Sequence, residues 1–269
     1  MGYLQNLHTH TTFCDGRDTP EEVLRAALER GFDSIGFSEH STSRSPSSPT
    51  AERLAEYRRE IRLLARKYEG QIDVFCGLEF DTECPTPAIG YDYLIGSMHF
   101  IYRDGERFPV DGRNTEFERA AEHYGSALAF AKAYFEALCT LPDFGKFDIV
   151  GHFDLVSKNV ERTSLLDPED PTYIQAGLAA IDALAGRIPF FEVNTGAIAR
   201  GYRTAPYPAP VFLRALREKG FGAVITSDCH DARFLDCHFD GALALLEECG
   251  FTERYILTRD GFKAVALRD

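Results

Sequence analysis

Apolar residues along the chain gather in seven short runs, and polar residues follow each run. In chain order the runs are GYLQNLHTH, DSIGFSEH, IDVFCGLEFD, YDYLIGSMH, FDIVGHFD, PFFEVNT and FGAVITSDCH. Each run has the length of a buried strand, and stretches with helical periodicity separate the runs. Because strands that alternate with helices are typical of parallel βαβ units, the pattern predicts a barrel or a doubly wound sheet.

The stretch after the first run carries the signals of a helix. Thr19 and Glu22 fit a capping box, Pro20 occupies the first helical position, and Gly31 closes the segment. Three more glycines end later helical patterns in the same way, namely Gly70, Gly220 and Gly250. These signals predict helices as the connectors between the strands.

Two segments interrupt this alternation. The first, SEHSTSRSPSSPTAE, reads as a Ser/Pro loop, and the second, residues 101–146, is a longer insertion with a helical run near residues 116–139. Long connections in a compact domain often lie over a functional site, so either segment can overhang one. We expect a single domain over residues 1–269, because the length suits one α/β barrel and no repeat is visible.

Polar side chains that can bind metal end almost every apolar run. In order they are His8 and His10, Glu39 and His40, Glu79, His99, His152, Glu192 and Asn194, and Asp228 and His230. The carboxyl ends of the strands of a parallel barrel open onto one face. Six of the eight histidines are therefore expected to meet there, together with the carboxylates of Asp15, Glu79 and Asp228. Only His123 and His238 fall outside the pattern.

Each of these residues has an ordinary explanation when it is taken alone. A single histidine at a strand end is usually a surface or hydrogen-bonded residue, Asp15 or Asp228 can cap a helix, and Glu79 can form a salt bridge. The set as a whole is harder to explain, because buried ionisable groups are costly unless they are paired or bind metal. The joint pattern therefore indicates a metal centre.

The ligand types narrow the choice of metal. Imidazole and carboxylate groups without an obvious thiolate suit Zn, Mn or Fe. A catalytic zinc ion takes about three protein ligands, so nine candidates predict two or three divalent ions with a bridging carboxylate. Clustered divalent ions are typical of phosphoester hydrolysis.

The amino-acid composition indicates which binding partners and which cellular compartment to expect. The net charge of −13 argues against nucleic acid, but bound cations would still allow a small anionic substrate. Taken alone, the net charge is better explained by an ordinary soluble, acidic protein. Seven scattered cysteines without a CxxC pair indicate reduced thiols in a cytoplasm, and we expect neither a membrane span nor a secretory signal.

Several of these motifs resemble those of one family. HTHTTFCDG, FSEHS, GLEFD, GSMHF, GHFDL and SDCH resemble the successive motifs of the PHP (polymerase and histidinol phosphatase) superfamily. The insertion, with VDGRNTEFERAAEHYG, and the stretch FFEVNTGAIARG are similar to the monofunctional histidinol-phosphatase type. This resemblance implies a distorted (β/α)7 TIM-like barrel, the PHP fold, with a trinuclear metal centre.

The resemblance also implies a ligand set. The first ion would be held by His8, His10, Glu79 and Asp228. Glu79 would bridge to a second ion, which His99 and His152 also bind. The third ion would be held by Asp15, His40 and His230. Glu79, Asp228 and His230 are the candidates for catalytic residues. Asp15 stands where many members have histidine, which can alter metal preference. Glu39 is either a hydrogen-bond partner of a ligand or a core residue in a salt bridge.

The activity implied is hydrolysis of L-histidinol phosphate to L-histidinol and phosphate in histidine biosynthesis, with a metal-bridging hydroxide as nucleophile. Arg200 is a candidate phosphate ligand. Lys158 is a second candidate, although for Lys158, Arg162 and Arg44 a solvated surface charge is the favoured reading. An acid or an aromatic wall for histidinol can come from Asp81, Phe100, Tyr102 or Tyr202.

Two alternatives stay open. The first is a PHP phosphoesterase that acts on another small phosphomonoester or on a nucleotide. The second is a non-catalytic metal-binding module, although such a module should have lost ligands, and this chain presents a full set.

Overall fold

The computed structural model describes residues 2–41, 49–82 and 88–267. Seven strands form one sheet in the order β1-β2-β3-β4-β7-β8-β9, and every neighbouring pair is parallel. Their bounds are β1 Gln5–Asn6, β2 Ser34–Phe37, β3 Asp73–Phe80, β4 Tyr93–Gly96, β7 Ile149–Val150, β8 Phe190–Asn194 and β9 Gly222–Thr226. Each of the seven apolar runs thus contains one strand.

The sheet curves until its two edges meet just beyond β1 and β9. Thr9 and Cys229 form a parallel bridge, in which the His10 amide donates to the Cys229 carbonyl at 2.8 Å and the Cys229 amide donates to the His8 carbonyl at 3.0 Å. The predicted distorted (β/α)7 barrel is confirmed. Of the two architectures that the alternation left open, the chain adopts the barrel.

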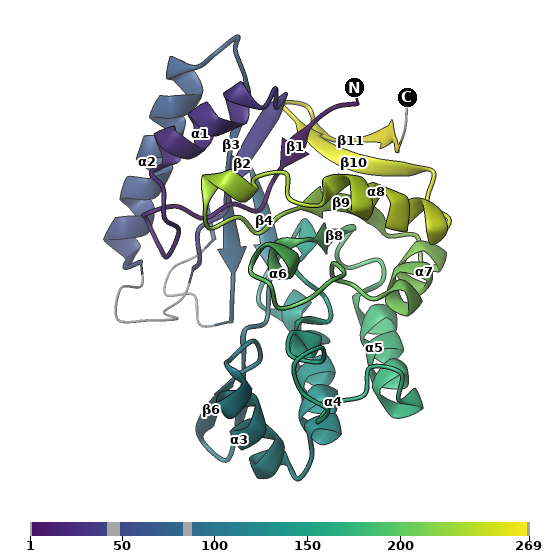
Figure 1. The fold of residues 1–269 in the computed structure, drawn as a ribbon. Coiled ribbons are helices and arrows are strands. Elements are labelled where there is room, and N and C mark those ends of the chain that lie inside the picture. Colours follow the sequence, from purple (N-terminus) through teal and green to yellow (C-terminus); the bar gives the residue numbers. More distant parts are fainter. Residues whose placement is uncertain (1, 42–48, 83–87, 268–269) are drawn as a thin grey trace.

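Helices surround the barrel (Figure 1). They are α1 Pro20–Glu29, α2 Ala51–Lys67, α5 Pro171–Leu184, the short α6 Gly196–Ala199, α7 Pro210–Glu218 and α8 Phe239–Glu248. The capping box of Thr19 and Glu22 is present at the start of α1, with Pro20 as its first residue. The four glycines expected after α1, α2, α7 and α8 all adopt positive φ, between 76° and 87°. These local signals were therefore read correctly.

A hairpin closes the amino-terminal end of the barrel. It consists of β10 Glu253–Thr258 and β11 Gly261–Ala266. Gln5, at the start of β1, exchanges two hydrogen bonds of 2.8 Å with the backbone of Leu257. Phe190, at the start of β8, packs on the rings of Tyr255 and Phe262. The carboxyl end of the barrel is thus left to carry the functional groups.

The segment between β4 and β7 differs in detail from the expectation. A hairpin of β5 Phe100–Arg103 and β6 Glu106–Pro109 comes first, and two helices follow, α3 Asn114–Tyr124 and α4 Ala127–Leu138. The helical run expected near residues 116–139 is present but divided into two helices, because Gly125 ends α3 at φ 89° and the Ser126 side chain caps α4. In Figure 1, α3 and α4 extend below the barrel, and α4 packs beside α5.

Two further findings concern the whole described chain. Within residues 2–41, 49–82 and 88–267, no helix is both long and apolar enough to cross a membrane. The six described cysteines are all free thiols. Arg44 and Cys84 lie outside the described residues.

Candidate metal centre

Glu79 lies at the centre of the polar cluster at the carboxyl end of the barrel. It is the penultimate residue of β3, and its side chain is 1% exposed. Five imidazoles face its carboxylate, at distances of 2.6 Å for His40 Nδ1, 3.0 Å for His152 Nε2, 3.3 Å for His99 Nε2, 3.4 Å for His8 Nε2 and 3.6 Å for His10 Nε2. Burial alone would raise the pKa of Glu79, but the surrounding imidazoles hold that pKa well below its usual range. The carboxylate is therefore charged.

Asp228 forms a second focus, two residues beyond β9. Its Oδ1 lies 3.2 Å from His10 Nε2, 3.5 Å from His230 Nδ1 and 3.7 Å from His8 Nε2. The residue adopts φ 46°, a left-handed conformation that is uncommon for residues other than glycine. Arg200 holds this conformation, because it donates to the backbone oxygen of Asp228 at 2.9 Å and to Oδ2 at 2.8 Å.

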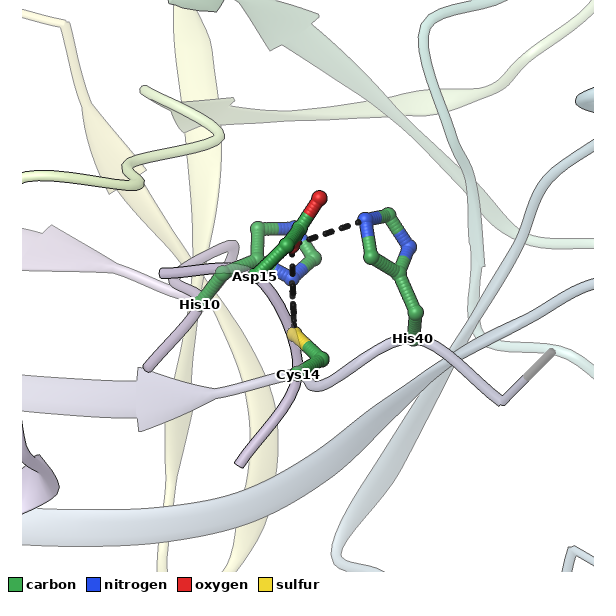
Figure 2. Close-up of side chains that lie close together, drawn as sticks. All are labelled: His10, Cys14, Asp15 and His40. Atoms are coloured by element: carbon green, nitrogen blue, oxygen red, sulfur yellow. Dashed lines mark hydrogen bonds and ion pairs between the residues drawn. The ribbon is translucent and has the colours of Figure 1, made fainter. Parts of the chain in front are cut away.

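Asp15 lies at the solvent-facing side of the cluster, where two imidazoles face its carboxylate. Its Oδ1 lies 3.2 Å from His230 Nε2 and 3.4 Å from His40 Nε2. Figure 2 shows Asp15 between His10 and His40, with the sulfur of Cys14 below the His10 ring. Although burial raises the pKa of Asp15, the two neighbouring imidazoles hold that pKa well below its usual range. Nearly half of the Asp15 side chain is exposed, so this group borders solvent.

The donor set fits divalent cations. Ligand atoms lie within 4.8 Å of one another in three groups, namely His8, His10 and Asp228; His40, Glu79 and His99; and His10, Cys14, Asp15 and His40. The Nε2 atoms of His8, His10 and His40 are buried without a hydrogen-bond partner among the described residues. Since buried polar atoms are normally satisfied, lone pairs that converge beside two carboxylates are what a metal centre requires.

Cys14 lies beside His10 and Glu39 at the edge of this cluster. Its Sγ lies 3.4 Å from His10 Nδ1 and donates to Oε2 of Glu39 at 2.7 Å. Burial and the neighbouring carboxylates of Glu39 and Asp15 raise the pKa of the thiol well above its usual value. The protonated thiol is the hydrogen-bond donor to Glu39, and Cys14 also belongs to the third group of ligand atoms.

Two buried carboxylates accept hydrogen bonds from ligand histidines, and a third, that of Glu39, accepts from Cys14 beside His10. Glu192 accepts from His8 Nδ1 at 2.8 Å and from the His152 amide at 2.7 Å. Asp81 accepts from both Nδ1 and the amide of His99 at 2.9 Å. Glu39 accepts from the amide and hydroxyl of Thr11 and from Cys14. Carboxylates that accept from the second ring nitrogen fix the orientation and tautomer of ligand histidines.

These three positions refine the expectations from sequence. Asp81 was a candidate partner for the substrate, but it is buried against His99, so that suggestion is wrong. Glu39 accepts hydrogen bonds from Thr11 and Cys14, and among residues 2–41, 49–82 and 88–267 it forms no salt bridge. The role of Glu192 was missed, although an acid inside the apolar run PFFEVNT was a visible signal.

A cavity of about 550 Å³ opens onto the cluster. Six of the nine predicted metal ligands contribute to its lining, namely Asp15, His40, His99, His152, Asp228 and His230. Its outer wall comes partly from the segment between β4 and β7, through residues such as Phe100, Arg107 and Glu116. The long connection after β4 therefore borders the site.

Both side chains predicted from the sequence as candidate phosphate ligands, Arg200 and Lys158, line the cavity. Arg200 lines the wall with its side chain 35% exposed, beside Asp228. Lys158 lines it too, but its Nζ donates to the Asp111 carbonyl at 2.6 Å and lies 4.4 Å from the Tyr202 ring. Arg162 stacks on the same ring from 4.2 Å and does not line the cavity.

Of the aromatic candidates, Phe100 and Tyr202 line the cavity, whereas Tyr102 does not and is 53% exposed.

Comparison with known proteins agrees with this geometry. Residues 6–195 match the sequence profile of the PHP domain family. A probable histidinol-phosphatase of Deinococcus radiodurans is 30% identical over 264 residues, which cover 93% of this chain and 95% of the relative. The histidinol-phosphatase of Bacillus subtilis is 26% identical over 269 residues, covering 90% and 98%.

A solved structure shows the same fold. The histidinol phosphate phosphatase of Lactococcus lactis, determined with zinc, L-histidinol and phosphate, superposes with a TM-score of 0.72 at 20% identity over 97% of this chain and 98% of that one. The order of the seven strands, the cluster around Glu79 and the profile match lead to one conclusion. The chain belongs to the PHP domain family and, within it, to the histidinol-phosphatase type.

Proposed function

We propose that this protein is a metal-dependent phosphatase that hydrolyses L-histidinol phosphate to L-histidinol and phosphate in histidine biosynthesis. The observation that carries the proposal is the histidine and carboxylate cluster at the floor of a cavity sized for a small molecule, with Arg200 in its wall. The relatives in Deinococcus radiodurans and Bacillus subtilis that span nearly the whole chain are named for this activity.

We assign the ligands to two or three divalent ions, Zn, Mn or Fe. The first ion would be held by His8, His10, Glu79 and Asp228, the second by Glu79, His99 and His152, and the third by Asp15, His40 and His230. Bound divalent ions supply a nucleophilic water at neutral pH and neutralise the charge on the phosphate oxygens. Glu192 and Asp81 keep the Nε2 lone pairs of His8 and His99 directed at the centre.

The residues that border the cavity act on the substrate itself. Glu79, Asp228 and His230 remain our candidates for catalytic residues, and the last two line the cavity. Arg200 would bind a phosphate oxygen through those N–H groups of its guanidinium that do not donate to Asp228. Lys158 is a weaker candidate, because its ammonium group already donates to Asp111. Phe100 and Tyr202 would pack against the histidinol portion.

The remaining assignments follow from charge and chain organisation. A net charge of −13 supports a small phosphorylated metabolite over nucleic acid as partner. The free thiols support a cytoplasmic location. We propose that residues 1–269 act as one domain, with residues 101–146 as the insertion that borders the site.

Phosphate release from a substrate panel tests the proposal. The purified protein would be assayed with Mn²⁺, Zn²⁺ and Fe²⁺, and after chelation, on histidinol phosphate, sugar phosphates, amino-alcohol phosphates and nucleotides. A kcat/KM for histidinol phosphate well above all others is expected. Metal-dependent release with another best substrate would favour the alternative phosphoesterase, and no release with any metal would leave the binding module.

A further inference from the structure

The segment 200–209 connects α6 to α7 and contributes Arg200, Tyr202 and Tyr207 to the cavity wall. It contains no helix or strand, although Tyr207 exchanges two backbone hydrogen bonds of 2.9 Å with Asn194, and the amides of Tyr202 and Arg203 donate to the Ala197 carbonyl. Side chains of another part of the fold add further contacts along the segment.

The loop that follows β7 supplies those contacts. Asp154 accepts from the Ala209 amide at 3.1 Å, and the Glu161 carboxylate accepts from the Thr204 amide at 2.9 and 3.0 Å. Arg162 donates to the Gly201 carbonyl at 2.6 Å. The segment is thus held at its beginning, middle and end by one neighbouring loop.

The hydroxyl of Ser157 lies between two charged residues of this interface, Arg203 and Asp154. The guanidinium of Arg203 donates to the Ser157 hydroxyl, which donates to the Asp154 carbonyl at 2.7 Å and lies 3.5 Å from its carboxylate. Arg203 also lies 4.6 Å from the centre of the Tyr207 ring. Asp154, Ser157 and Tyr207 are each 1% exposed.

Asp154 is linked to Arg203 through the hydroxyl of Ser157. Loss of the guanidinium would break this link between the two segments, weaken the contact of Asp154 with the Ala209 amide and loosen the segment that carries Arg200.

We propose that Arg203 and Asp154 are positioning residues, which hold segment 200–209 so that Arg200 and Tyr202 face the bound phosphomonoester. Neither is a predicted metal ligand, and neither lines the cavity. The inference rests on the proposed function for the role of Arg200, but it concerns the binding of the phosphate group, whatever alcohol is attached.

The test uses inorganic phosphate as the probe. Its dissociation constant from metal-loaded protein would be measured by titration calorimetry for the wild type, Arg203→Met and Arg203→Lys. Arg214→Met, which removes an exposed arginine of α7, is the matched control. We expect phosphate affinity to fall about tenfold or more in Arg203→Met, because a small displacement of a binding group is costly. Arg203→Lys should restore most of the affinity, and Arg214→Met should leave it unchanged.

A second readout separates positioning from general loss of structure. Hydrogen exchange of the amides in segment 200–209 should accelerate in Arg203→Met, while β8, β9 and the metal content stay as in the wild type. If Arg203→Met does not fold, the double variant Asp154→Asn/Arg203→Met removes both charges and is tested in the same way. Wild-type phosphate affinity and wild-type exchange in either folded variant would overturn the proposal.

The outcome is distinguishable from failure of the proposed function. A wild-type protein that binds phosphate but releases none from histidinol phosphate would refute the substrate and leave the positioning role standing. Arg203→Met with normal phosphate binding in an enzyme active on histidinol phosphate would refute the positioning role alone.

Discussion

The Nδ1 atom of His8 lies 2.8 Å from a carboxylate oxygen of Glu192, and neither side chain is exposed. The carboxylate can only accept, so Nδ1 carries a proton, and Nε2 is the ring nitrogen left to bind an ion beside Glu79 and Asp228. The same carboxylate also accepts from the His152 amide, so one acid orients ligands from two strand ends.

Replacing Glu192 by Gln should therefore weaken metal binding. The amide can donate to His8 and favour the wrong tautomer, and we expect metal affinity to fall about 10–100-fold. Metal content after dialysis against a graded chelator measures the effect. Glu118→Gln, at an exposed position of α3, is the control. Equal metal retention in both variants would contradict the role of Glu192.

Glu79→Gln should remove metal as well as activity. The charged carboxylate faces five imidazoles, and the neutral amide cannot bridge two cations. Elemental analysis of the purified variant would be compared with phosphate release from histidinol phosphate. A variant with full metal content and full activity would refute the assignment of Glu79 as a bridging ligand.

Arg200→Ala should raise KM for phosphomonoesters far more than it lowers thermal stability. The arginine contributes a charged contact to phosphate, so we expect an increase in KM of about tenfold or more, which corresponds to the loss of one charge-assisted hydrogen bond. Arg59→Ala, at an exposed position of α2, is the matched control. If KM stays unchanged, Arg200 serves only to hold Asp228.

Tyr202→Ala and Tyr102→Ala form a matched pair for the aromatic wall. Tyr202 lines the cavity between Lys158 and Arg162, whereas Tyr102 is exposed outside it. Only Tyr202→Ala should raise KM for histidinol phosphate, and by more than it weakens inhibition by inorganic phosphate, because the ring would contact the histidinol portion. Equal effects of the two substitutions would exclude this placement.

Gly125→Ala should destabilise the fold without affecting the site. Gly125 has φ 89° and no atom within 4 Å of an added Cβ, so the cost is backbone strain of about 1–2 kcal/mol. Urea denaturation measures the free energy of unfolding. Gly145→Ala is the control, because an added Cβ there meets only the Phe147 ring at 3.8 Å and φ lies outside the left-handed region. Equal stability of the two variants would contradict the strain argument.

The sequence by itself determined the strands and the ligand candidates. Buried parallel strands appear as short apolar runs, and the carboxyl ends of such strands share one face, so His8, His40 and Glu79 could be placed together before any coordinates. Capping signals such as Thr19 and Glu22 are equally local, because they act within one turn of helix.

Only the tertiary structure decided what lies behind the ligands and what borders the substrate. Asp81 and Glu192 meet His99 and His8 across 18 and 184 residues, and no local pattern encodes such a pairing. The contacts by which Arg203 and Asp154 hold segment 200–209 cannot be predicted from the sequence either, because the residue type does not tell whether a charged side chain is buried or exposed. Periodicity reports which face of an element is buried, but partners are chosen by packing between elements that are distant in the chain.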